Sequence, residues 1–313
     1  MQAQLQINSG ALVPSPAGFD IIVYAAPTQE EKLEAMRLWG LDVYDVESAL
    51  DPDEIPRIEY SSGRAALIWN WPRNAAVADQ IRFDVASMGL FLTQGKLIIV
   101  TDDPRVPFSA KEFAGASSAL DVLLRLLLHT VHHYLGHLPV IKQMTVELSS
   151  KIGASMENKY FLEMFALRES LVYYLNAIEA NGAVLAKLRA NAERLALPPQ
   201  QVEFLHDLIL DNQQCARQAQ IHSSVLAGLM DARGTIINNN VNVLLKNLTL
   251  INVVFLPLTL IASIGGMSEF TMMTKEIDWR LSYSLLSIGM VLLGWITWAA
   301  LVRILDKREP RRR

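Results

Sequence analysis

Two long apolar stretches lie near the C-terminal end of the chain. Residues 247–268, NLTLINVVFLPLTLIASIGGMS, contain no ionisable side chain, and residues 281–305 form a second apolar run that carries Trp295 and Trp298. A helix needs about 20 apolar residues to cross the hydrocarbon core of a bilayer. The pattern therefore predicts two membrane-spanning helices, 247–268 and 281–305, joined by a short polar loop over 269–280.

Polar side chains, with two leucines among them, recur along one face of the first span. Steps of three and four residues place them on one side of a continuous helix. The positions are Asn242, Leu245, Thr249, Asn252, Leu256, Thr259, Ser263 and Gly266. Polar groups at membrane depth normally face partner helices or a wet cavity, and one stripe cannot enclose a pore. The stripe predicts a ring of identical subunits around a cation path, with close helix packing without conduction as the alternative.

The first third of the chain has short strand patterns between helix signals. Residues 1–18 predict a flexible tail, because prolines lie there among small residues. Residues 19–107 predict an α/β domain, with a helix that Thr28 and Glu31 open as a capping box and that Gly40 ends. Strands are expected at 20–26, 57–60, 65–71, 88–93 and 96–101. Because no βαβ rhythm is present, the pattern favours an α+β fold over a doubly wound sheet.

From residue 108 the hydrophobic period is that of helices. Residues 108–199 predict long cytoplasmic helices over 117–155 and 156–195, with Gly136 and Pro139 as points of interruption in the first. A third helical pattern begins at Gln200, after two prolines. It runs without proline into the first span, so a continuous helix would have about 68 residues and a length of ~100 Å. We expect residues 200–246 to be a stalk that enters the bilayer as the pore-lining helix.

Charge and composition set the compartment. A basic tail over 306–313 follows the second span, and the positive-inside rule places this tail, and with it the N-terminal domain, in the cytoplasm. No positive n-region with a long apolar segment is present at the start, so no signal peptide is expected. A single cysteine, Cys215, excludes an internal disulfide framework. The net charge of −4 is too small to indicate nucleic acid. The two spans and the polar stripe make membrane lipids and other copies of the chain the expected partners.

Three segments carry a resemblance to a known family. FLPLTLIASIGGM (255–267), EIPRIEY (54–60) and MGLFLTQGKLIIV (88–100), together with the two spans and the basic tail, resemble the CorA superfamily of divalent-cation transporters. The resemblance implies a CorA-like funnel: a homopentamer of α/β cytoplasmic domains whose long helices gate a central pore. It implies transport of Mg²⁺ or another divalent cation (Zn²⁺, Co²⁺ or Ni²⁺) across the cytoplasmic (inner) membrane, with no cofactor and no enzymatic activity.

The pore mouth departs from that family. Its members have Gly-Met-Asn there, whereas this chain has Gly266, Met267 and Ser268. The family's asparagine amides hold a cation through its water shell, which suits Mg²⁺ because this ion dehydrates reluctantly. The shorter Ser268 predicts a wider and less selective ring. The acids Glu269, Glu276 and Asp278 would concentrate cations at the mouth by electrostatic attraction.

The resemblance also assigns expected roles along the stripe. Counting back from Ser268 without a gap, Asn242 and Leu245 fall at the family's cytoplasmic constriction and Leu256 at a hydrophobic girdle. Thr259 and Ser263 fall at polar steps nearer the mouth. Asp207, Asp211 and Asp84 are candidates for a cytosolic regulatory metal site between subunits, although acidic residues on a long helix are more often a solvated face.

Two other functions remain as alternatives. A relative that lost the family's asparagine would be a non-conducting or regulatory membrane scaffold with the same fold. His129, His133 and His137 lie at helical spacing and would allow a zinc enzyme, since histidines four residues apart can bind zinc. No glutamate occupies the position of a metalloprotease general base, so a polar helix face is the preferred interpretation of these histidines.

Overall fold

The computed structural model describes residues 2–8, 10–15, 18–61, 63–77, 80–103, 108, 110–154 and 158–308. The chain divides into two compact units, Met1–Met230 and Asp231–Arg313. Helix α5 (Pro199–Gly265) contributes residues to both units.

The first unit is built on a mixed sheet of seven strands within the described residues. In chain order they are β1 (Gln2–Asn8), β2 (Ala11–Pro14), β3 (Ile21–Ala25), β4 (Arg57–Ser61), β5 (Arg64–Val77), β6 (Gln80–Thr93) and β7 (Lys96–Thr101). Their order across the sheet is β2-β1-β3-β7-β6-β5-β4. Strands β3 and β7 run parallel and the other neighbouring pairs are antiparallel. This arrangement confirms the predicted α+β fold, because a doubly wound sheet would be mostly parallel.

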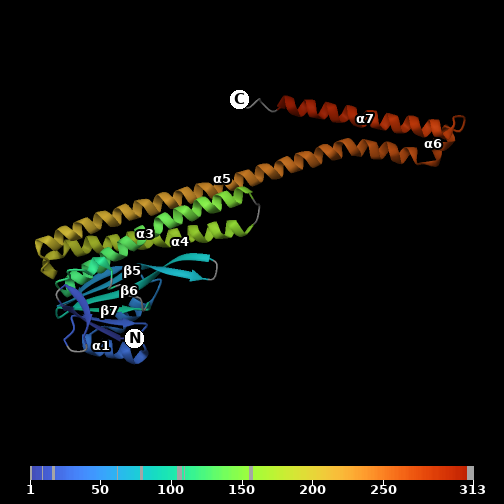
Figure 1. Cartoon of the computed structure of the whole chain (residues 1–313). Helices are drawn as coiled ribbons and strands as arrows, with labels where there is room; N and C mark the ends of the chain where they lie inside the picture. Colours follow the sequence, from blue (N-terminus) through green and yellow to red (C-terminus); the bar gives the residue numbers. More distant parts are fainter. Residues whose placement is uncertain are drawn as a thin grey trace. The chain divides into compact units, whose positions relative to one another are not determined.

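Helices cover both faces of this sheet (Figure 1). On one face lie α1 (Gln29–Trp39) and α2 (Val43–Leu50), and on the other lie α3 (Ala119–Ala154) and α4 (Asn158–Ala190), with the first part of α5 in the same hydrophobic core. Strand β3 shows why two layers form: Ile21 and Val23 belong to the core under α3 and α4, whereas Ile22 and Tyr24 belong to the core under α1 and α2. Successive side chains of a strand point to opposite faces, so an all-apolar strand needs cover on both sides.

Local signals place the helix ends where the sequence predicts them. The Thr28 side chain accepts a hydrogen bond from the Glu31 backbone N–H at 3.3 Å, and Glu31 accepts one from the Thr28 backbone N–H at 2.9 Å, which completes the capping box of α1. Gly40 ends that helix in the left-handed conformation, with φ of 65°. Helix α3 continues through Gly136 and Pro139 without interruption, and α5 is one helix of 67 residues.

The N-terminal residues correct one prediction. Strands β1 and β2 occupy most of the segment that was expected to be a flexible tail, and they extend the sheet beyond β3. In β1 the apolar residues Ala3, Leu5 and Ile7 alternate with glutamines and pack against the main core. This period of two is the signal for a half-buried strand. The prolines that suggested a tail lie at and beyond the end of β2.

The second unit has one more element than the sequence predicts. A short helix, α6 (Ser268–Met273), begins at the last residue of the predicted first span and continues into the predicted loop, and the second apolar run forms α7 (Trp279–Arg308). The predicted basic tail lies outside the described residues from residue 309 onward.

A buried asparagine of α4 pairs with the edge of β5 where that strand has no strand partner. Strand β4 pairs with β5 only as far as Ile68, so beyond that residue β5 has no neighbour on this side. The Asn181 side chain accepts a hydrogen bond from the Asn70 backbone N–H at 3.1 Å and donates one to the Asn70 carbonyl at 2.6 Å. Asn181 is fully buried, so its amide replaces the missing strand partner where water cannot.

We expect Asn181→Leu to destabilise the full-length protein by about 3 kcal/mol, because two buried backbone groups would lose their partners at roughly 1–3 kcal/mol each. Chemical or thermal unfolding of the purified protein measures the loss. Asn176→Leu is the control, since Asn176 is exposed on the same helix and should change stability by no more than about 0.5 kcal/mol. Equal stability of the two variants would contradict the edge-protecting role.

Candidate functional site

Helices α5 and α7 each contain a segment long and apolar enough to cross a membrane, by length and composition. Of the most apolar window in each helix, only 6% of the α5 window and 0% of the α7 window are buried within the chain. A core helix of a soluble protein would be mostly buried. These segments therefore present their apolar surface outward, as helices in contact with lipid or with other copies do.

Within the second unit, α7 packs against one face of α5. A Cβ placed on Gly265 would lie 2.6 Å from the Leu286 side chain, and one placed on Gly294 would lie 3.2 Å from the Leu258 side chain. The Tyr283 hydroxyl donates a hydrogen bond to the Gly265 carbonyl at 3.2 Å. Glycines at these contacts let the two helices approach closely, which is the usual way in which helices associate in membranes.

The predicted stripe lies on the opposite face of α5. The face toward α7 includes Val254, Leu258 and Gly265, of which Val254 is 9% exposed. The stripe positions Asn252, Leu256 and Ser263 precede these by two residues, and a two-residue offset is a rotation of about 200° around a helix. The stripe residues are exposed along this segment. Helix α7 thus leaves the polar face of α5 uncovered.

Two stripe hydroxyls are bonded to their own helix. Thr249 donates a hydrogen bond to the Leu245 carbonyl at 2.8 Å, and Thr259 donates one to the Phe255 carbonyl at 2.8 Å. Such bonds satisfy the hydroxyl proton and leave the oxygen lone pairs directed outward. The face therefore offers acceptor oxygens, which are the ligands that hard divalent cations prefer.

The end of the first span is a tight turn. Helix α5 ends at Gly265, so Gly266 lies in the turn and not in the helix that was expected to include it. Met267 precedes α6, and Ser268 is the first residue of that helix. The Ser268 hydroxyl donates a hydrogen bond to the Glu269 carboxylate at 3.3 Å. The Ser268 oxygen is thus exposed beside a negative charge. The serine side chain is shorter than the asparagine side chain expected at this position from the resemblance.

The predicted loop acids have different environments. Asp278 accepts a hydrogen bond from the Arg280 backbone N–H at 2.9 Å, so this carboxylate helps to start α7. Glu269 and Glu276 are exposed. Within the parts of the chain that the structure covers, no three His, Cys, Asp or Glu side chains form a group that could hold a metal ion. A single copy therefore provides negative charge at the loop without a metal cage.

The same finding applies to the candidate regulatory acids of the first unit. Asp84 lies exposed on β6, while Asp207 and Asp211 lie on α5, and they form no metal-binding group in one chain over the described ranges. A regulatory site that they would form between copies stays a prediction.

The histidines of α3 have different environments: His133 and His137 are packed, whereas His132 is exposed and lies 3.3 Å from the Glu112 carboxylate. The rings of His133 and His137 are 4.5 Å apart, and His137 Nδ1 lies 2.7 Å from the Tyr174 hydroxyl. Phe83 contacts His137 from the sheet, with ring centroids 5.4 Å apart. Burial, with smaller contributions from His137 and His129, lowers the pKa of His133 to about 4. His133 and His137 therefore fill space between the sheet and the helices, and for these two residues the expected polar face is corrected.

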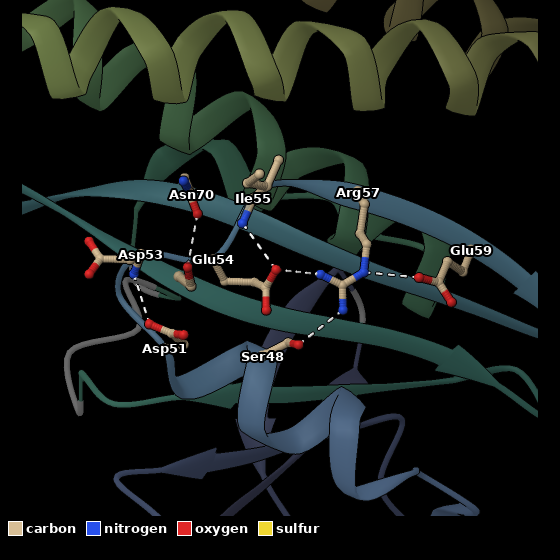
Figure 2. A network of polar contacts seen from close by, with 9 residues as sticks. Ser48, Asp51, Asp53, Glu54, Ile55, Arg57, Glu59 and Asn70 are labelled. Carbon is tan, nitrogen blue, oxygen red and sulfur yellow. Dashed lines mark hydrogen bonds and ion pairs between the residues drawn. The ribbon is translucent and has the colours of Figure 1, made fainter.

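The carboxylates around Arg57, at the start of β4, are likewise structural (Figure 2). Arg57 donates to the Glu54 carboxylate at 2.8 Å, to Glu59 at 2.9 Å and to the Ser48 hydroxyl at 3.0 Å. Its guanidinium also lies 4.7 Å from the centre of the Tyr44 ring. One arginine is therefore shared by two glutamates and ties β4 to α2 through Ser48, which leaves the polar face of α5 as the better candidate site.

Comparison with known proteins decides the family. A family model described as "CorA-like Mg2+ transporter protein" matches residues 16–308. The chain belongs to this family.

Known relatives of this CorA-family chain agree in length and fold. The "Cobalt/magnesium transport protein CorA" of Methanocaldococcus jannaschii is 23% identical over 251 residues, which is 77% of each protein. The complete structure of the CorA magnesium transporter from the same organism superposes with a TM-score of 0.75 at 20% identity, covering 99% of this chain and 98% of that one. The full-length CmaX structure gives a TM-score of 0.70 at 13% identity, over 96% and 97%.

Family membership places this chain among the CorA-like divalent-cation transporters, whose members are transporters and not enzymes. Sequence reasoning found the span and its polar face, because both depend on local periodicity. It missed which face α7 covers, the bonding of the stripe threonines and helix α6. The small residues Gly265 and Gly294 were the available signal for the α5–α7 contact.

We expect the stability of the protein to fall as the pH falls from about 6.5 to about 4, by at most about 1.4 kcal/mol per pH unit from His133. The pKa of His133 is lower in the folded state than in the unfolded state, so within this window the unfolded chain binds more protons. His133→Gln should flatten this part of a melting-temperature profile measured in detergent. His132→Gln, at an exposed position of the same helix, should not; an unchanged profile for His133→Gln would contradict the assignment.

Proposed function

We propose that copies of this chain assemble into a homopentamer in the cytoplasmic (inner) membrane, and that their α5 helices line a pore for divalent cations. Mg²⁺ is the first candidate, with Co²⁺, Zn²⁺ or Ni²⁺ as others; the curated relative from Methanocaldococcus jannaschii is named as a cobalt/magnesium transporter. The observation that carries the proposal is the exposed polar face of α5 opposite α7. Such a face is costly against lipid, whereas a ring of α5 helices would turn it toward a water-filled centre.

The proposed path follows the stripe from the cytoplasm outward. Asn242 and Leu245 would form the cytoplasmic constriction, and Thr249 and Asn252 would follow on the same face. A ring of Leu256 side chains would close the pore by dewetting. Thr259, Ser263 and Gly266 would then lead to the mouth, where Gly266, Met267 and Ser268 stand in place of the family's Gly-Met-Asn.

The charges at the two ends of the membrane segments support a path with its mouth at the loop and its other end in the cytoplasm. Exposed Glu269 and Glu276 would raise the local concentration of cations at the mouth, and Asp278 would add to the same field. Arg303 and the basic residues after it favour a cytoplasmic C-terminus, and two spans return the N-terminal unit to the same side. Asp84, Asp207 and Asp211 are the proposed cytosolic regulatory residues, with ligands from neighbouring copies.

The alternative is a non-conducting membrane protein that kept the fold. The observation that favours it is Ser268, whose short side chain and bond to Glu269 offer less to a hydrated cation than an asparagine amide does. The two functions differ in whether divalent cations cross the membrane at all.

We expect wild-type proteoliposomes to take up Mg²⁺ and Co²⁺ faster than empty vesicles, as read by an enclosed metal-sensitive dye. Ser268→Asn should raise the preference for Mg²⁺ over Co²⁺ by about fivefold to tenfold, a difference of roughly 1 kcal/mol, because a longer amide narrows the ring. Ser284→Asn, an exposed position on α7, is the matched control. Correctly assembled protein without flux in either form would favour the non-conducting alternative.

A further inference from the structure

Asn252 carries the one amide side chain between Thr249 and Ser268. It lies on the face of α5 that is turned away from α7 and is exposed there. An amide has two N–H donors and two acceptor lone pairs. The backbone of its own helix cannot pair all of them, whereas it can accept the single hydroxyl proton of a threonine. The side chain therefore needs partners from outside its own helix.

Among the described residues of one chain, no such partner is present. Thr249 and Thr259, which flank Asn252 on the same face, bond to carbonyls of α5. None of the hydrogen bonds among the described residues involves the Asn252 side chain, while α7 packs on the far side. An unpaired amide in hydrocarbon is strongly disfavoured, so the partner is another copy, pore water or a cation.

We infer that Asn252 is the specificity-determining residue inside the membrane: the amides of Asn252 from neighbouring copies bind the hydrated divalent cation within the span. This inference rests on the proposed function. A ring of amide oxygens accepts hydrogen bonds from the water shell of the ion, so it discriminates cations by the size and firmness of that shell.

The neighbours of Asn252 explain why the selection occurs there. Leu256, one turn further on, offers no oxygen, and the threonine oxygens lie close to the helix surface because their protons are bonded to it. At the mouth, Ser268 is short and exposed. Asn252 therefore places the longest polar reach of this face deeper in the span, where fewer waters compete for the ion.

The chain offers a matched control in Asn247. This residue has the same side chain on the same helix, but it lies five residues earlier, which turns it by about 140° away from Asn252. Removing its amide alters composition and helix propensity in the same way as removing that of Asn252, without changing the face that carries the stripe.

The test compares uptake of Mg²⁺ and Co²⁺ into proteoliposomes by wild type, Asn252→Ala, Asn252→Asp and Asn247→Ala, with assembly checked by light scattering. We expect Asn252→Ala to change the Mg²⁺/Co²⁺ ratio by about tenfold, the loss expected for about one hydrogen bond to the water shell, and Asn247→Ala to leave it within about twofold. Asn252→Asp keeps the oxygens and adds charge, so Mg²⁺ should block Co²⁺ uptake at a lower concentration than in wild type.

The outcomes separate this inference from the proposed function. Wild-type flux with unchanged ratio and block in both Asn252 variants overturns the role of Asn252 and leaves the pore intact. Loss of assembly in both Asn252 variants also overturns it, because the amides would then join helices and not bind ions. Absence of flux in assembled wild-type protein refutes the proposed function itself, and the inference with it.

Discussion

Hydrocarbon cannot hydrogen-bond, and this constraint governs the membrane part of the chain. The α-helix satisfies the backbone, and Thr249 and Thr259 satisfy their hydroxyl protons on carbonyls of the same helix. Helix α7 covers the face around Leu258 and Gly265 and contributes nothing to the opposite side. What remains is a polar face that one copy cannot satisfy. The same face would be a defect in a monomer and a water-lined wall in a ring, so the proposed function depends on assembly.

Helix α5 has two different environments along one continuous backbone. In its first part, Leu205, Leu208 and Cys215 are buried in the core beneath the sheet, and in its last part the apolar residues face outward. No break separates the two parts between Pro199 and Gly265. The packing that holds the soluble unit together and the face proposed to carry ions therefore belong to the same helix. A rearrangement of that packing acts on an element that continues into the membrane.

The polar clusters of the soluble unit are used for structure. Asn181 completes the edge of β5, Arg57 joins β4 to α2, and His137 bonds to Tyr174 beneath the sheet. Each of these groups is paired because burial makes an unpaired polar group costly. Their engagement removes them as candidates for metal chemistry in one chain. It also explains why the histidine spacing, which suggested zinc, corresponds to a row of packed rings.

The sequence by itself determined the features that depend on neighbours along the chain. The two spans, the polar stripe, the capping box at Thr28 and the helix end at Gly40 all follow from residues a few positions apart, and the α+β class follows from the order of the elements. Only the tertiary structure decided that β1 joins β3, that the histidine row is buried and that α7 lies opposite Asn252. These depend on contacts between distant segments. A hydrophobic period of two or of 3.6 residues shows which face of a strand or helix is apolar, but not which element packs against that face. Which side of a helix is covered is set by the helix that packs against it.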